Sequence, residues 1–107
     1  MSPNTVETKL KAEQALVDSR FDFIAKYHAV ADLRRLARMT PSVLDRQTIT
    51  AVETLLQSDR FIRVRQSYFL FREAAAVVRD MIDSPGGTNG DGTGKRALTA
   101  LAYLLRK

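Results

Sequence analysis

The stretch of residues 59–82, DRFIRVRQSYFLFREAAAVVRDMI, contains no glycine or proline and spaces its apolar side chains as a helix does. At 100° per residue, these side chains gather on one broad arc of a helical wheel. The expected core residues on this arc are Val64, Tyr68, Phe71 and Val78. The arc is widened on its other side by Leu70, Ala74, Val77 and Met81. The sequence therefore predicts one long amphipathic helix at the centre of the fold.

The polar side of this predicted helix has two features of its own. Arg65, Arg72 and Arg79 follow one another at i, i+7 and i+14 and would form one ridge. A second, narrow apolar line runs through Ile62, Phe69 and Ala76. Such a line predicts a helix that is contacted on more than one side, although the alternative is that Phe69 is a lone exposed aromatic.

The arginine ridge and Phe69 are the candidate partner-binding residues of the chain. Guanidinium groups on one ridge can meet carboxylates or phosphates of a partner. The alternative is that these arginines pair with acids of their own or neighbouring helices, which contributes little to stability. The predicted partner-binding residues are Arg65, Phe69, Arg72 and Arg79.

The rest of the chain is also predicted to be helical, with capping residues between the helices. Pro3 suits the first turn of a first helix, whose thin apolar stripe is Val6, Leu10 and Val17. Thr40 and Pro41 end one helix and begin the next, because the residue before proline is disfavoured in a helix. The other predicted helices span 21–39, 42–57 and 95–107.

All five glycines lie in the segment 84–94, which is predicted to be a flexible loop. Its sequence, ending in Gly94-Lys95, invites comparison with the phosphate-binding loop G-x-x-x-x-G-K-[ST]. The first glycine of that motif is Asn89 here, and Arg96 replaces the hydroxyl residue that binds magnesium. We therefore favour a linker and expect no cofactor.

Composition limits the class of protein. Hydrophobic residues make up 45% and charged residues 27% of the 107 residues, as in a globular domain. The chain has no apolar run long enough to span a bilayer and no secretory signal, so we expect a cytoplasmic protein without a membrane partner. The net charge is +5, but acids are dispersed among the bases. A solvated basic surface is favoured, and nucleic-acid binding is the alternative.

Catalytic and metal-binding patterns are weak. His28 is the only histidine, Asp32 alone stands at i+4 from it, and there is no cysteine. Two ligands are too few for a metal site, and no Ser-His-acid set can be assigned. Asp80 and Asp83 lie one turn apart at a predicted helix end and are better suited to terminating that helix. We expect neither an enzyme nor a metalloprotein.

A shift of the sequence by forty residues aligns the end of the first predicted helix with the end of the third. The identical pairs are Glu13 with Glu53, Leu16 with Leu56, Arg20 with Arg60, and Phe21 with Phe61. A period near forty with two helices per unit is the range of HEAT and armadillo repeats.

The segment LLQSDRFIRVRQSYFLFREAA resembles the second-helix pattern of HEAT-like repeats. The residues that carry the resemblance are Leu55, Leu56, Asp59, Val64 and Arg65. Tyr68 and Phe69 stand where the family usually has small residues, and the turn proline is missing. The resemblance covers residue 12 to the C-terminus, and it implies a binding scaffold without naming a partner.

The sequence thus predicts a single all-α domain over residues 1–107, built as a right-handed HEAT-like α-solenoid of about five helices; the alternative is a four- to five-helix bundle. The predicted function is a non-catalytic protein–protein interaction scaffold or accessory module. Its partner would be another protein or the rest of a longer chain, since the sequence stops abruptly in LAYLLRK. The alternatives are a basic nucleic-acid-binding domain and a regulatory N-terminal domain of an enzyme.

Overall fold

The structure is a computed structural model that describes residues 2–83 and 92–107. The described residues form helices and no strand, which confirms the all-α prediction. They contain six α-helices and one 3-10 turn, one α-helix more than predicted. The elements are α1 (Pro3–Val17), α2 (Phe23–Met39), η1 (Pro41–Val43), α3 (Arg46–Leu56), α4 (Asp59–Arg65), α5 (Phe69–Asp83) and α6 (Thr93–Arg106).

Side-chain caps decide where four of these helices begin. Ser2, Asp22, Asp45 and Ser58 each accept a hydrogen bond from the backbone N–H three residues later. Such caps satisfy donors that the first helical turn leaves unpaired. Asp22 therefore starts α2 two residues later than predicted. Asp45 starts α3 four residues later than predicted, and the 3-10 turn η1 occupies residues in between.

The prediction of one continuous helix over residues 59–82 is wrong. The chain turns at residues 66–68, which separates α4 from α5. The turn brings the rings of Phe61 and Phe71 to 5.8 Å between centroids. Ten residues of uninterrupted helix would hold them about 15 Å apart along the axis. Phe61 is fully buried and also packs edge-on against Phe23 at 5.5 Å, so this aromatic cluster needs the break.

The break also changes which side chains enter the core. Val78 is buried and Phe71 is partly buried, as predicted. Val64 and Tyr68, however, are 43% and 36% exposed, which corrects their assignment to the core. The reason is that α4 turns a different side inward, the side that carries Phe61 and, one turn later, Arg65, while Tyr68 lies in the turn between α4 and α5.

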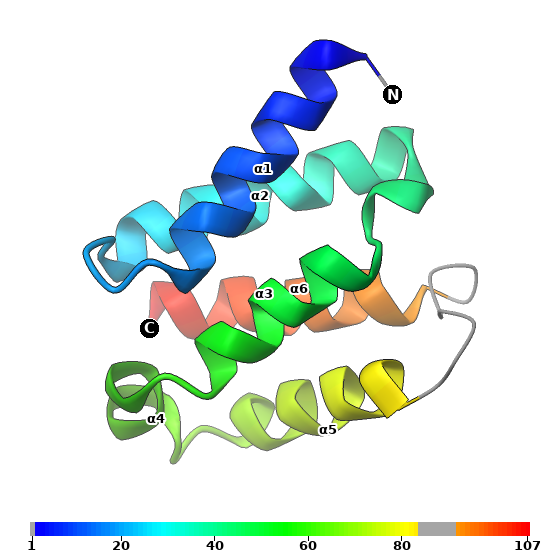
Figure 1. The fold of residues 1–107 in the computed structure, drawn as a ribbon. Helices are drawn as coiled ribbons and strands as arrows, with labels where there is room; N and C mark the ends of the chain where they lie inside the picture. The colour runs from blue at the N-terminus through cyan, green and yellow to red at the C-terminus, as the bar shows by residue number, and fades with distance from the viewer. Residues whose placement is uncertain (1, 84–91) are drawn as a thin grey trace.

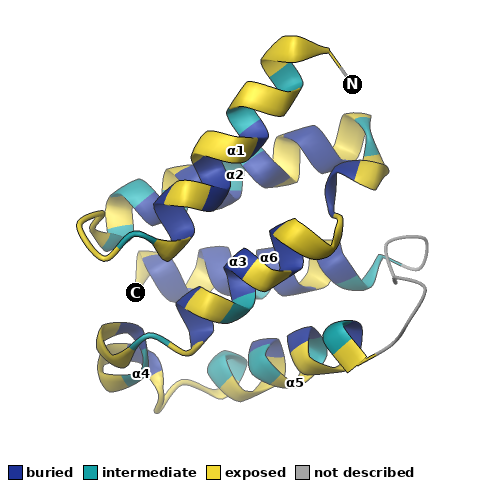
Figure 2. Cartoon of the chain, viewed as in Figure 1, coloured by how far each residue is buried: buried dark blue, intermediate teal, exposed yellow. Residues whose placement is uncertain are grey.

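The five longer helices pack in a cycle, α1–α2–α6–α5–α3–α1. Figure 1 shows α1, α3 and α5 following one another in one layer, with α2 and α6 behind them. The buried residues face the space between these helices, as Figure 2 shows, and the molecule measures 37 × 28 × 17 Å along its principal axes. In a linear array of helix pairs, α2 and α5 would be the second helices of successive pairs and would lie side by side. Here α6 lies between them.

The first helix buries a different side from the one predicted. Val6, Leu10 and Val17 are 38%, 47% and 41% exposed. The buried side instead consists of small or apolar residues together with two charged ones: Lys9, Ala12, Glu13, Ala15 and Leu16. The apolar stripe was therefore a poor guide to the packing of α1.

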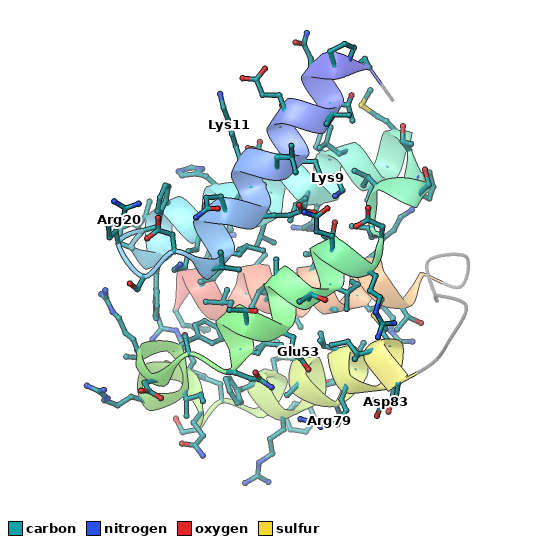
Figure 3. The ribbon with its side chains drawn as sticks, viewed as in Figure 1. Lys9, Lys11, Arg20, Glu53, Arg79 and Asp83 are labelled. Carbon is teal, nitrogen blue, oxygen red and sulfur yellow. The ribbon has the colours of Figure 1, made fainter. Side chains whose placement is uncertain are left out.

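A polar network between α1 and the start of α3 explains this choice. Lys9 Nζ lies 2.7 Å from Glu13 Oε2 and 3.3 Å from Asp45 Oδ2. The Thr48 hydroxyl lies 2.5 Å from the same Glu13 oxygen. Burial disfavours the Lys9 ammonium, but the bonds and charges of Glu13 and Asp45 outweigh it and raise the pKa of Lys9. Figure 3 labels Lys9 where α1 approaches α3.

Candidate protein-binding surface

The predicted arginine ridge does not form, because its first member belongs to a different helix from the other two. Arg65 lies on α4 and is 8% exposed, whereas Arg72 and Arg79 are exposed on α5. Arg65 Nε donates a hydrogen bond to the carbonyl oxygen of Leu104, and the guanidinium carbon lies 4.9 Å from the centroid of the Phe23 ring. Arg65 therefore holds the last turn of α6, where carbonyl groups lack helical partners.

Two further cations, Lys26 and Arg46, donate hydrogen bonds to carbonyl oxygens at the ends of other helices. Lys26 Nζ, which is buried, donates to carbonyl oxygens at the end of α1, those of Ala15, Leu16 and Asp18 at 2.7, 3.2 and 2.8 Å. Burial lowers the pKa of Lys26, and the positive charge of Arg60 lowers it further, against the opposing charge of Asp18. Arg46 Nη2 donates to the Ile82 carbonyl oxygen at the end of α5 at 3.4 Å. Part of the basic charge is thus used to stabilise helix C-termini.

The other predicted site residues lie on the outer side of α5. Phe69 is 78% exposed, so the stacking neighbour predicted for it is not found among the described helices. Arg72 and Arg79 form no ion pair within residues 2–83 and 92–107. Figure 3 shows Arg79 on the side of α5 that faces away from the other helices.

A groove of about 430 Å³ runs between α5 and α6. Its apolar lining is supplied by both helices: Leu70, Ala74, Val77, Ala97, Ala100 and Tyr103. Ala74 and Ala97 are buried, whereas Leu70, Val77 and Ala100 are only partly covered. Alanine at the contact leaves too little side chain to fill the space between the helices, so the hollow remains open. Glu73, Lys95, Arg96 and Thr99 complete the lining.

The groove contains none of the predicted partner-binding residues. In the sequence, its α5 side is part of the widened apolar arc, and alanines at positions 74, 97 and 100 are a further signal. The predicted helix over 95–107 in fact begins at Thr93, after Gly92 with its φ of +82°. The rest of the predicted loop, residues 84–91, lies outside the described residues.

A second hollow of about 420 Å³ lies on the other side of α6, against α2. Tyr27 and Arg34 of α2 line it together with α6 residues that include Tyr103 and Arg106. The Arg106 guanidinium carbon lies 5.5 Å from the centroid of the Tyr27 ring, and Lys107 Nζ lies 4.5 Å from that of Tyr103. Among residues 2–83 and 92–107, no acidic residue lines this cleft.

The exposed face of α6 connects the two hollows and is strongly basic. Thr99 and Tyr103 line both the α5–α6 groove and the α2–α6 cleft. Residues 93–107 contain four cations and no acid: Lys95, Arg96, Arg106 and Lys107. Within the part of the chain that the structure describes, neither these four nor Arg34 forms an ion pair. Apolar surface and unpaired positive charge therefore meet along one helix.

Comparison of the chain with protein-family models, with curated proteins and with solved structures finds no match. The resemblance to HEAT-like repeats therefore stays a prediction. No described helix is long and apolar enough to cross a membrane. Among residues 2–83 and 92–107, no three His, Cys, Asp or Glu side chains are grouped so as to hold a metal ion.

Proposed function

We propose that this chain is a non-catalytic protein-binding module whose α5–α6 groove receives an amphipathic helix of a partner protein. The observation that carries the proposal is the groove itself, an apolar hollow between two packed helices that the described residues leave uncovered. Helix-in-groove recognition uses this geometry, with apolar anchors at i, i+3 or i+4, and i+7 on the incoming helix.

The dimensions suit such a partner. The lining residues run from Leu70 to Val77 on α5 and from Lys95 to Tyr103 on α6, about 10–12 Å along each helix, which matches about two turns of a docked helix. A pair of packed helices offers a third helix a row of gaps between side chains, at an interaxial distance of about 8–10 Å. Leu70 and Val77, two turns apart on α5, border the gaps that leucine-sized anchors would enter.

The HEAT-like scaffold is part of the proposal. In that interpretation α1 pairs with α2, and α3 pairs with α4 and α5, as two successive repeat units of a cytoplasmic protein. The burial of Leu16 and Leu56, which the forty-residue shift aligns, supports it. A regular array would place α5 in the layer of α2, whereas Figure 1 shows it in the layer of α1 and α3. The position of α6 between α2 and α5 departs from a regular array.

Nucleic-acid binding is the second candidate, because four cations of α6 and Arg34 of α2 have no ion-pair partner among the described residues. Two observations weigh against it. Arg65, Lys26 and Arg46 are used at helix ends, so the basic charge available to a partner is smaller than the net charge suggests. Apart from Tyr103, the apolar lining of the groove consists of Leu, Val and Ala, which suit a peptide better than stacked bases.

The test is selection from a displayed library of helical peptides of about 15 residues with apolar positions at heptad spacing. We expect binders that lose affinity at least about tenfold against an Ala100→Glu variant, which puts charge and bulk at the groove edge. Ala76→Glu, the same change on the exposed outer side of α5, is the matched control and should leave affinity unchanged. Circular dichroism checks that both variants are folded.

Two outcomes would overturn the proposal. One is a selection that yields no binder, or only binders that treat the two variants alike. The other is sedimentation analysis showing a dimer that Ala100→Glu dissociates, since the groove would then be covered by a second copy of the chain.

A further inference from the structure

From the charge around α6, we infer that the partner helix is acidic and that its carboxylates bind Arg34 and Arg106 in the α2–α6 cleft. This inference rests on the proposed function, because it assumes a helix seated in the α5–α6 groove. It adds the chemical character of that helix and a second contact site, which the groove alone does not specify.

The first step is the continuity of the surface. Thr99 and Tyr103 border both hollows, so only the exposed ridge of α6 separates them. Neighbouring gaps between packed helices lie about 8–10 Å apart, and a helix with its side chains is about 10–12 Å wide. Long side chains on one flank of a helix in the groove therefore reach across this ridge into the cleft.

The second step is the state of the cleft. Arg34 and Arg106 line it without an acidic neighbour, and neither has an ion-pair partner within the described chain. Arg106 is held over the face of Tyr27, which orients its guanidinium group while its N–H donors stay available. Two guanidinium groups in one hollow form a site for carboxylates, because each can bind one in a bidentate manner.

The third step distinguishes carboxylates of a protein from a nucleic-acid strand. Single-stranded nucleic acids bind such proteins by stacking bases on aromatic faces. Here Arg106 lies over the ring of Tyr27, and Lys107 lies over the ring of Tyr103. The cleft thus presents positive charge over these two ring faces, beside a groove whose apolar lining is aliphatic apart from Tyr103. This combination fits an amphipathic helix with one acidic flank.

The experiment uses the tightest peptide from the library and a version with every Glu and Asp changed to Gln or Asn. We expect the selected peptide to be acidic and to bind five- to tenfold more tightly than its neutral version, with a difference that shrinks at high salt. The double variant Arg34→Gln/Arg106→Gln should remove most of that difference. Its effect on the neutral peptide should be small.

The matched control is Arg72→Gln/Arg79→Gln, which removes the same two charges from the exposed side of α5. It should change the affinity for the acidic peptide less than about twofold, since exposed charges at a distance are screened. The same comparison tests the predicted role of Arg72 and Arg79 in partner binding. Urea unfolding of both double variants shows whether either affects the fold.

The outcomes separate the inference from the proposed function. If both double variants weaken the acidic peptide equally, or the neutral peptide binds as well, the inference fails while groove binding stands. If no peptide binds, the proposed function fails. If a single-stranded oligonucleotide binds more tightly than the acidic peptide and Arg34→Gln/Arg106→Gln abolishes that binding, the cleft belongs to nucleic acid and the inference is overturned.

Discussion

Removing one partner of the buried Lys9–Glu13 pair is expected to destabilise the fold strongly, whereas removing both is not. Lys9 and Glu13 are 3% and 6% exposed, and Lys9 Nζ lies 2.7 Å from Glu13 Oε2. Glu13→Leu leaves the ammonium with Asp45 at 3.3 Å as its remaining acid. Lys9→Met leaves a buried carboxylate that keeps the Thr48 hydroxyl, while Glu13 Oε1 already has no donor among the described residues.

The magnitude follows from this difference in remaining partners. Breaking a buried ion pair on one side costs about 3–5 kcal/mol, because the other charge is left without compensation. Lys9→Met should lie near the upper end of that range, and Glu13→Leu near its lower end, since Asp45 still faces Lys9. The double variant Lys9→Met/Glu13→Leu should cost less than either single change, because it leaves no unpaired charge from the pair and apolar side chains fill similar volumes.

Urea unfolding followed by circular dichroism measures these free energies. With a slope of about 1.5 kcal/mol/M, a loss of 3 kcal/mol lowers the midpoint by about 2 M. Glu7 and Lys11 supply the control, because they form an i, i+4 pair on the same helix at 3.0 Å but are 62% and 76% exposed. Glu7→Leu and Lys11→Met should each cost well under about 1 kcal/mol. Figure 3 labels Lys9 of the buried pair and Lys11 of the exposed pair.

The reasoning is refuted if Lys9→Met and Glu13→Leu cost as little as the changes at the exposed pair. It is also refuted if the double variant costs the sum of the two single changes. The first result would mean that α1 does not bury this side against α3, and the second would mean that Lys9 and Glu13 do not stabilise the fold as a pair.

Three further outcomes follow from individual contacts. Phe61→Ala should cost about 3–5 kcal/mol in urea unfolding, because it empties the fully buried centre of the aromatic cluster; a loss below about 1 kcal/mol would contradict the described break between α4 and α5. Arg65→Gln should lower the unfolding free energy by about 1.5–3 kcal/mol and increase amide exchange in the last turn of α6, since Leu104 loses a charged donor; unchanged exchange there would count against this cap. Bonds from Arg20 hold the pKa of Asp18 below its ordinary value, so this contribution to stability is present above about pH 4 and is lost as the pH falls. Asp18→Asn should therefore flatten the acid limb of stability against pH, and an unchanged acid limb would contradict the pairing.

The helices could be predicted from sequence where local signals define them. Ser2 and Pro3 mark the start of α1, and Thr40 with Pro41 marks the end of α2, because a cap or a proline acts on backbone groups within one turn. Asp22 and Asp45 are also local caps, and they start α2 and α3 two and four residues later than the predicted helix starts. The buried residues of α6 include Leu98, Leu101, Ala102 and Leu105, whose i, i+3, i+4 and i+7 spacing is the sequence signal of one helix face.

The candidate site could not be predicted in this way. The predicted arginine ridge requires one continuous helix from residue 59 to 82. The chain instead turns at 66–68, where no glycine or proline signals a break. The groove depends on α5 and α6 lying side by side, and the cleft depends on α6 lying against α2, which are contacts between segments distant in the chain. Arg65 and Arg72 have the same residue type and helical spacing, yet one caps α6 and the other faces solvent.

The amino-acid sequence by itself determined that this chain is helical and where most helices start, since hydrogen bonds within four residues and their caps are local. The tertiary structure decided which side of each helix is buried. On α1, Lys9 and Glu13 could be buried in place of Val6 and Leu10, because Asp45 and Thr48 approach them from the start of α3. A buried charge is acceptable only where its partners gather, and the chain brings them together only on folding.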